Sequence, residues 1–408
     1  KIAIYFLSTI CNGKAKMKRL YTIVNSGVFF IALGLGLSCN PPKENTAQRK
    51  FSITVRDSIN IENLDPLHLK GYDPLSDHYL LSNAGIGIRQ IFQVNGKGTI
   101  TSHFTIPEEG PNALSNPGSV GFLNGAIIIY DMEKGFVKLN PDSSIIPEAK
   151  IPYPHNYLFF PPHLPLIKQS GEEMYYIKPL IDEDFIDGMG EQFYKNYYSK
   201  SLLEKHNSKT GETKPYLKIP EQSVFKDGMN HGIYVPVIKN KGNDWLVSTW
   251  FDPFVYLYKE NDDGITFEKA IDLQITGMNK YQSVEMKNSD QFFDINAGKR
   301  PGNINDILFM DDYTVIVYRK GLTDQEQKDI KANFPNQTKM EMEKKDTFYA
   351  VILDKDYNVL DSKVNFPNGV YYPNIVNKSN EIIALKNPDL FDVEENYVTL
   401  YRMELGFE

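Results

Sequence analysis

The chain has 408 residues, of which 12% are aromatic and only two are cysteines. Every acidic residue follows residue 38, whereas five of the 44 basic ones precede it. The chain from residue 39 on therefore carries 39 basic and 52 acidic side chains, a net charge of −13. Such an acidic domain is poorly suited to attract nucleic acid or anionic lipid head groups by charge, so nucleic acid is not an expected partner.

The first 50 residues show the pattern of an export signal. Met17, the first methionine, is followed by Lys18-Arg19, a mostly apolar run over 20–37, and Cys39. A short basic region, an apolar stretch and a small residue before a cleavage point are typical of secretory signals. We therefore interpret 1–38 as upstream residues and a lipoprotein signal peptide, and 39–50 as the lipidated cysteine and a tether. The alternative is a membrane-spanning anchor over 20–37, although this run is near the lower length limit for crossing a bilayer.

The segment Leu35-Gly36-Leu37-Ser38-Cys39 resembles a bacterial lipoprotein lipobox, with one departure: Gly36 stands where Leu is usual. The resemblance implies that Cys39 carries a lipid, which would attach the protein to a membrane. It implies a location in the bacterial cell envelope, facing the periplasm or exposed on the outer membrane. The other cysteine, Cys11, precedes Met17, so we expect no disulfide and no cysteine-bound metal in the mature domain.

A recurring unit organises the remainder of the chain. Two or three apolar residues after Pro165, Pro236 or Pro373 are followed by a polar turn and an apolar strand, and 305–318 repeats this pattern without the proline. The segment 109–140 is a further antiparallel meander, with Asn-Gly and Glu-Lys-Gly at its turns. A single twisted sheet cannot bury both of its faces, so repeated four-stranded sheets are expected to pack radially.

We predict an all-β fold, a six-bladed β-propeller with four-stranded antiparallel blades, over 51–408. The blades are expected at approximately 72–108, 117–152, 163–219, 232–275, 303–366 and 370–404. The apolar segment 51–60 would add a strand to the last blade and close the ring. The spacing leaves room for insertions at 182–198 and at 322–334, the second of them a short helix. Seven blades or a pair of β-sandwiches are the alternatives.

The segment 260–267 resembles the Asp box of sialidase-like propellers, with Glu260 in place of the first serine. In that motif an aspartate accepts backbone hydrogen bonds in a turn between outer strands. The resemblance therefore supports a blade and does not imply sialidase chemistry.

Neither catalytic residues nor metal ligands are predicted. Neighbouring carboxylates could act as general acid and base in glycoside cleavage. The candidate groups all lie in polar turns or insertions, where we interpret them as solvated charge: 182–184, 262–263, 311–312 and 394–395. No two histidines have metal-ligand spacing. The alternative to a protein without a cofactor is one that binds a divalent cation such as Ca²⁺. Such a site would need oxygen ligands from several blades to converge on the axis. The candidate ligands are Asn303, Asn305, Asp306 and Asn374.

The candidate binding residues are those expected at the mouth of the propeller: His163, His231, Trp250, Asn305, Asp306, Tyr372 and Asn374. His163 ends an unusual Pro- and aromatic-rich stretch, 152–163, which could pack between blades or form a recognition surface. Exposed aromatic side chains suit sugar or peptide binding, but Trp250 could equally belong to the core.

Two features resemble the DUF4221 lipoproteins of Bacteroidetes, which fall among the six-bladed TolB-like propellers. These are the Ser38-Cys39-Asn40 lipobox and Glu109-Gly110-Pro111-Asn112 ahead of the strand that contains Phe122. The resemblance implies the fold and the location, but no catalytic residues. The leading hypothesis is a lipid-anchored, non-catalytic module that binds a saccharide, a peptide or an envelope protein. The alternative is a carboxylate- or metal-dependent envelope hydrolase or lyase acting on a saccharide or lactone.

Overall fold

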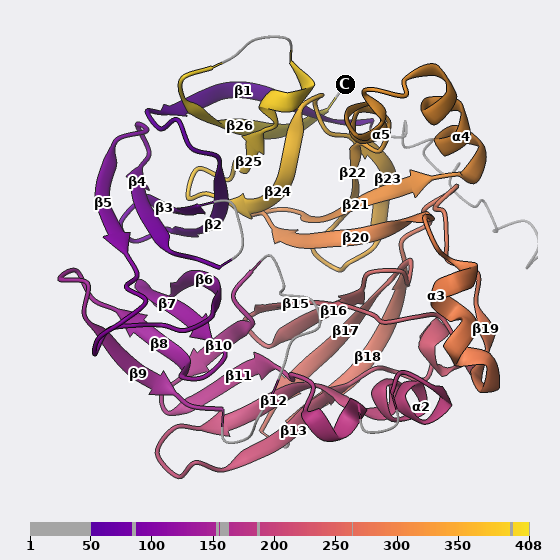
Figure 1. The fold of residues 1–408 in the computed structure, drawn as a ribbon, viewed down its shortest axis with the longest axis horizontal. Helices are drawn as coiled ribbons and strands as arrows, with labels where there is room; N and C mark the ends of the chain where they lie inside the picture. Colours follow the sequence, from indigo (N-terminus) through magenta and orange to yellow (C-terminus); the bar gives the residue numbers. More distant parts are fainter. Residues whose placement is uncertain are drawn as a thin grey trace, which may run out of the picture. The chain divides into compact units, whose positions relative to one another are not determined.

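Six four-stranded antiparallel sheets are arranged around a central axis in the computed structural model (Figure 1). The structure describes residues 50–83, 87–151, 155, 163–185, 188–262, 264–391 and 395–407. This arrangement confirms the predicted six-bladed propeller and contradicts both the seven-bladed and the β-sandwich alternatives. The predicted export signal, the predicted tether before residue 50 and the predicted lipidation site Cys39 lie outside the described residues.

Each of the first three blades is a continuous stretch of chain, with its innermost strand first. Blade 1 contains β2 (Leu67–Asp73), β3 (His78–Asn83), β4 (Gln90–Asn95) and β5 (Ile100–Thr105). Blade 2 contains β6 (Pro117–Leu123), β7 (Ala126–Asp131), β8 (Gly135–Leu139) and β9 (Ile145–Ala149). Blade 3 contains β10 (Leu166–Ser170), β11 (Glu173–Ile177), β12 (Ser201–Asn207) and β13 (Thr213–Lys218). Blade 1 thus begins at Leu67 and not at the predicted residue 72.

The next three blades follow the same order until the last strand. Blade 4 contains β15 (Pro236–Lys241), β16 (Asp244–Thr249), β17 (Phe254–Asn261) and β18 (Gly264–Asp272). Blade 5 contains β20 (Arg300–Phe309), β21 (Thr314–Leu322), β22 (Phe348–Leu353) and β23 (Val359–Asn365). Blade 6 contains β24 (Val370–Val376), β25 (Ile382–Lys386), β26 (Val398–Phe407) and β1 (Phe51–Ile61).

The ring is closed by β1, the first strand of the chain, which pairs antiparallel with β26 from Phe51↔Phe407 to Ile61↔Val398 (Figure 1). This pairing confirms the predicted role of 51–60. It joins the two ends of the described chain in one sheet, so the last blade cannot be completed until both ends are present.

Burial along the strands reflects the packing of blades on one another. The second strand of each blade is buried almost throughout, as in β7 and β25, because both of its faces pack against neighbouring blades. Strand β5, at the outer edge, alternates between exposed positions and positions that are partly buried or, at Phe104, buried. An unbroken apolar run is the sequence pattern of a strand that is buried on both faces. The apolar cores accordingly lie between adjacent blades.

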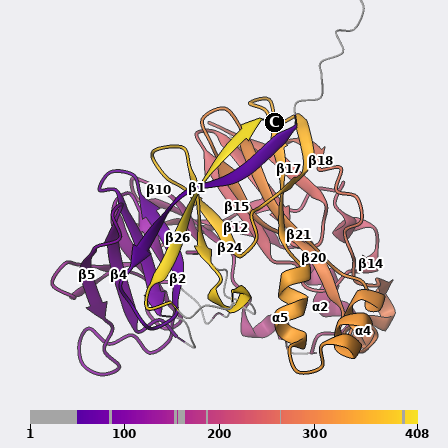
Figure 2. The same ribbon diagram turned by 90° about the horizontal axis from the view of Figure 1, so that it is seen from above.

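Five insertions carry short elements outside the blades: η1 (Asp182–Phe185) with α2 (Glu191–Ser199), η2 (Val224–Lys226) with β14 (Met229–Asn230), β19 (Val284–Glu285) with η3 (Met286–Gln291) and α3 (Phe292–Ile295), α4 (Asp324–Asn333) with α5 (Thr338–Lys345), and η4 (Pro388–Leu390). Figure 2 shows α2, α4 and α5 on the same face of the ring. Helix α4 confirms the predicted helix near 322–334, whereas α2, α3 and α5 were not predicted. Within the described part of the chain, no helix is long and apolar enough to cross a membrane.

Candidate functional site

A cavity of about 270 Å³ lies on the axis of the propeller. The innermost strand of every blade contributes to its wall: Lys70 from β2, Phe122 from β6, Ile167 from β10, Lys239 from β15, Asn305 from β20 and Asn374 from β24. Its volume is close to the lower end, about 300 Å³, of the range found for small-molecule sites. A concave site to which the innermost strands of all six blades contribute is a reasonable candidate for small-molecule binding.

Interruptions in the strand pairing shape the wall of this cavity. The register between β2 and β3 shifts around Lys70, that between β10 and β11 around Ile167, and that between β20 and β21 around Asn305. The pairing of β24 with β25 is interrupted between Tyr371 and Ile375, a segment that includes Asn374. A β-bulge adds a residue to one strand and redirects its side chain. Four of the six innermost strands therefore supply the cavity with a residue that is not paired in its sheet.

One buried carboxylate lies behind the wall and holds two of its residues. Asp306 is 1% exposed. Its Oδ2 lies 2.9 Å from His163 Nε2, and its Oδ1 lies 3.0 Å from Lys239 Nζ. Burial by itself would raise the pKa of Asp306, but the charge of Lys239 and the contact with His163 lower it below its usual value. Asp306 is therefore ionised, and its carboxylate lies within ion-pair distance of both partners.

Burial in this part of the structure lowers the pKa values of both His163 and Lys70. Burial lowers the pKa of His163 more than the nearby Asp306 raises it, and the positive charges of Lys239 and, to a smaller extent, Lys70 lower it further. Burial also lowers the pKa of Lys70, to about 8. No group among the residues that the structure describes forms an ion pair or hydrogen bond with the Lys70 ammonium.

Two side-chain amides leave acceptors unused at the cavity. The Oδ1 atoms of Asn305 and Asn374 are buried and accept no hydrogen bond from the described residues. Asn374 Nδ2 donates to the carbonyl oxygen of Leu69 at 3.3 Å, which links β24 to β2. Buried polar atoms are nearly always hydrogen-bonded, so an acceptor without a donor at a cavity wall is a position where a bound molecule can donate.

The rest of the lining is largely apolar and aromatic. Trp250, at the end of blade 4's second strand, lines the cavity together with Phe122 and Phe309. Aromatic faces of this kind can pack against the C–H surface of a sugar ring or against another apolar group. The wall thus combines a few fixed polar groups with an apolar surface, as small-molecule sites do.

The structure brings together most, but not all, of the candidate binding residues. His163, Trp250, Asn305 and Asn374 line the cavity, and Asp306 lies directly behind them.

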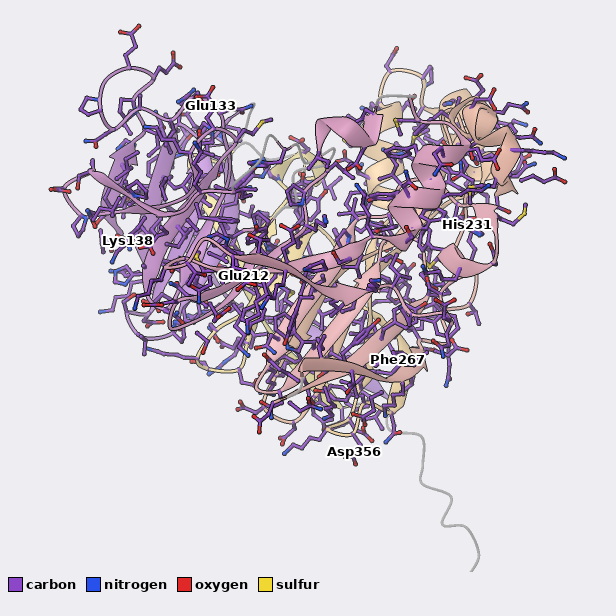
Figure 3. All side chains as sticks on the ribbon, turned by 90° about the horizontal axis from the view of Figure 1, so that it is seen from below. Glu133, Lys138, Glu212, His231, Phe267 and Asp356 are labelled. Carbon is purple, nitrogen blue, oxygen red and sulfur yellow. The ribbon has the colours of Figure 1, made fainter. Side chains whose placement is uncertain are left out.

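The other two candidates lie elsewhere. His231 Nε2 lies 2.9 Å from Asp227 Oδ2, and Figure 3 shows this histidine near the rim of the molecule and not at the axis. Tyr372 packs against Phe348 with 5.9 Å between the ring centroids.

Two important cavity residues, Lys70 and Lys239, were missed by the sequence analysis. Lys239 was assigned to a polar turn over 239–243, but β15 extends to Lys241 and the turn is shorter. Lys70 was placed ahead of the first blade. The available signal was weak: a lysine directly after the alternating apolar residues Leu67 and Leu69, in a strand that is only partly buried.

Those of the neighbouring carboxylates that the structure describes include two that form ion pairs with lysines. Asp312 pairs with Lys355 at 2.8 Å, and both side chains are largely exposed. Glu395 pairs with Lys386. Asp263, Glu394 and the side chains of Asp182 and Glu183 lie outside the described residues. Across the described ranges, no group of three or more His, Cys, Asp or Glu side chains is arranged to hold a metal ion.

The segment that resembles an Asp box forms the hairpin turn between β17 and β18, closed by the pair Asn261↔Gly264. Its Glu260 receives hydrogen bonds from Trp245 Nε1 at 2.9 Å and Tyr216 Oη at 2.9 Å. Lys168 Nζ lies 2.7 Å from the same carboxylate. Because Tyr216 and Lys168 belong to blade 3, Glu260 ties blade 4 to its neighbour, which is a structural role.

Comparisons with solved structures agree with this architecture. A member of the DUF4221 family from Bacteroides vulgatus ATCC 8482 is similar with a TM-score of 0.58 and 11% identity, covering 88% of this chain and 100% of that one. A putative exported protein from Bacteroides fragilis NCTC 9343 is similar with a TM-score of 0.50 and 13% identity, covering 88% and 96% of the two chains. No protein-family model matches the sequence, and no curated protein matches it. At these identities the likeness confirms the DUF4221-type fold and carries no activity with it.

Proposed function

We propose that the chain is a ligand-binding β-propeller of the bacterial cell envelope, related to the DUF4221 proteins and anchored through a lipid on Cys39. The lipobox-like segment before residue 40 supports the anchor. The similar fold of a protein described as exported supports a location outside the cytoplasm. In this proposal the propeller holds a small molecule in its axial cavity and releases it unchanged.

One observation carries the binding role. The side-chain oxygens of Asn305 and Asn374 and the ammonium of Lys70 have no partner among the described residues, and all three groups meet at one cavity. Burying a polar group without a partner costs about 1–3 kcal/mol, so three such groups at one site oppose folding unless they serve another purpose. A ligand with complementary groups would satisfy all three.

The test is a thermal-shift and fluorescence screen of the full-length chain in a mild detergent. Trp250 lines the cavity, so a ligand bound there should change tryptophan emission as well as raise the melting temperature. The Asn305→Ala/Asn374→Ala double variant should lose the response, whereas Asn243→Ala, at an exposed hairpin turn, should keep it. Responses that both variants retain, or an absence of any response to a broad panel, would contradict the proposal.

The His163–Asp306 pair supports an alternative, an envelope hydrolase or lyase. An imidazole held by a carboxylate is a common general base, and His163 lines the cavity. A metal-assisted version is less well supported, because Lys70 and Lys239 place positive charge beside the amide oxygens that would bind the cation. Recovery of a bound saccharide or lactone as a cleaved product, with loss of turnover in His163→Gln, would favour this alternative over simple binding.

A further inference from the structure

The charged groups around the axial cavity do not balance. None of the described residues that line it is acidic, and the one carboxylate behind the wall, Asp306, is already engaged by Lys239 and His163. Lys70 has no such partner among the described residues. With His163 neutral, the two lysines exceed the single aspartate by one positive charge. This excess lies inside a domain whose net charge is −13.

The position of Lys70 is a specific feature of the strand. The bulge in β2 places it between Leu69, which pairs with Leu81, and Gly71, which pairs with Leu80. Side chains alternate between the two faces of a regular strand, and an inserted residue changes that alternation. An unpaired buried ammonium is costly. A strand that includes a bulge at this lysine therefore fits a site that uses the charge.

The two amides indicate what else the ligand carries. Asn374 Nδ2 donates to Leu69 O, the backbone neighbour of Lys70, which turns Asn374 Oδ1 away from that bond. Asn305 Oδ1 is also buried and accepts no hydrogen bond from the part of the chain that the structure describes. An acceptor pair beside a cation calls for a molecule that has an anionic group and hydrogen-bond donors, and hydroxyl groups are the simplest neutral donors.

We propose, on the basis of the binding role above, that the axial cavity takes a small hydroxylated carboxylic acid, of which monomeric sugar acids are the representative class. The carboxylate lies against Lys70, hydroxyl groups donate to Asn305 and Asn374, and the C–H face of the molecule packs on Trp250. A cavity of 270 Å³ suits a single ring and not an oligomer.

Other ligand classes fit less well. A neutral sugar would leave the Lys70 ammonium unpaired. A divalent cation would meet two lysines, and like charges in an enclosed site repel strongly. A phosphate ester carries close to two negative charges near neutral pH, whereas the cavity offers one excess positive charge. A carboxylate, with a single charge and two acceptor oxygens, matches one lysine.

The experiment measures binding to the full-length chain in detergent by isothermal titration calorimetry, with tryptophan fluorescence as a second readout. The probes are D-galacturonate and D-glucuronate, their neutral counterparts D-galactose and D-glucose, D-glucose 6-phosphate, and CaCl₂. The variants are Lys70→Met, which removes the charge and keeps the length of the side chain, and Lys97→Met, a matched change at an exposed turn.

We expect at least one sugar acid to bind more tightly than its neutral counterpart. Lys70→Met should lower the affinity for that acid tenfold or more, because a charge-assisted hydrogen bond is lost. Lys97→Met should bind like the unmodified chain. Neutral sugars bound equally well by all three proteins, with loss of binding in the Asn305→Ala/Asn374→Ala variant, would overturn the acid specificity and leave the binding role standing. Tighter binding of the phosphate or of Ca²⁺ would also overturn it, and no binding by any probe or by the broader panel would contradict both proposals.

Discussion

Asp306 Oδ2, on the innermost strand of blade 5, lies 2.9 Å from Nε2 of His163, which comes just before the first strand of blade 3. The other carboxylate oxygen lies 3.0 Å from Lys239 of blade 4. One buried carboxylate thus connects three blades at the axis. The same contacts place His163 and Lys239 on the cavity wall, so stability and the candidate site depend on the same group.

Removing this carboxylate should destabilise the propeller strongly. In Asp306→Ala, Lys239 loses its anionic partner in a largely buried setting, and His163 loses its acceptor. Breaking a buried pair from one side costs about 3 kcal/mol or somewhat more. We expect the lower figure, because the side chains of Lys239 and His163 remain 28% and 24% exposed. Urea denaturation followed by circular dichroism measures the change.

The matched control is Asp312→Ala. Asp312 also pairs with a lysine, Lys355, at 2.8 Å, but the two side chains are 66% and 69% exposed. Exposed ion pairs contribute little to stability, so this variant should unfold at nearly the same urea concentration as the unmodified chain. Equal losses in the two variants would show that the position of Asp306 at the axis has no special importance.

The blade architecture could be predicted from the sequence because every blade repeats the same local pattern. Unbroken apolar runs such as Ile127-Ile128-Ile129 and the Asn124-Gly125 turn, where both residues have positive φ, specify hairpins with no long-range information. The cavity depends instead on where the register slips. A glycine such as Gly71 inside a strand can mark a bulge, but it does not specify which neighbour is left unpaired. Lys70 could therefore be assigned to the axis only after the pairing of β2 with β3 was known.

The same limit explains which of the candidate residues lie at the cavity. Asn305 and Asn374 lie in the repeated unit itself, whose first strand borders the axis in every blade. His231 lies between blades, in a connection that is long enough to leave the axis, and it pairs with Asp227 instead. Helix α2 was missed although its buried aromatic residues Phe193, Tyr194 and Tyr198 are spaced for one helical face, because the helix is only 9 residues long. Helix α5 has no regular apolar period, and tertiary contacts decide its conformation.

Closure of the ring by β1 leads to a second prediction. Ile61 is fully buried between blades 6 and 1, whereas Val55 on the same strand is 40% exposed. Ile61→Ala should lower the free energy of unfolding by about 2–5 kcal/mol, since it leaves a cavity in a closed core. Val55→Ala should cost much less. Chemical denaturation compares the two, and a larger effect at Val55 would be inconsistent with β1 closing the ring through its buried face.

Glu260 leads to a third prediction, on acid stability. Burial opposes its ionisation, but hydrogen bonds led by those from Lys168 and Trp245 lower its pKa below the ordinary value of 4.5. A carboxyl group with a lowered pKa in the folded state stabilises the protein above about pH 4.5, and this contribution is lost as the pH falls through the folded pKa. Glu260→Gln should therefore reduce stability at pH 7 and flatten its decline below pH 5.

The control for that measurement is Glu268→Gln, a change at an exposed position on the same hairpin. This variant should lose stability below pH 5 in the same way as the unmodified chain. Trp245 emission adds a second readout. Its Nε1–H donates to Glu260 at 2.9 Å, so its emission maximum should shift in Glu260→Gln and not in Glu268→Gln. If stability declined below pH 5 to the same extent in both variants, the hydrogen bonds to Glu260 would not contribute to acid stability.

Lys70 leads to the fourth prediction, that the unmodified chain becomes more stable in mild alkali. Burial lowers the pKa of Lys70 to about 8, from an ordinary value of 10.5. Below pH 8 both the folded and unfolded chains carry the proton; between pH 8 and 10.5 the unfolded chain binds more protons, so stability rises with pH. Lys70→Met should be more stable at pH 7, because a buried charge is removed, and it should lack this rise, whereas Lys97→Met should retain it. Melting curves from pH 7 to 10.5 measure both effects. If the candidate site uses the charge of Lys70, then Lys70→Met should be more stable and should also bind anions more weakly, a common trade-off at functional positions. A Lys70→Met variant that is less stable than the unmodified chain would contradict the assignment of a buried ammonium without a partner among the described residues.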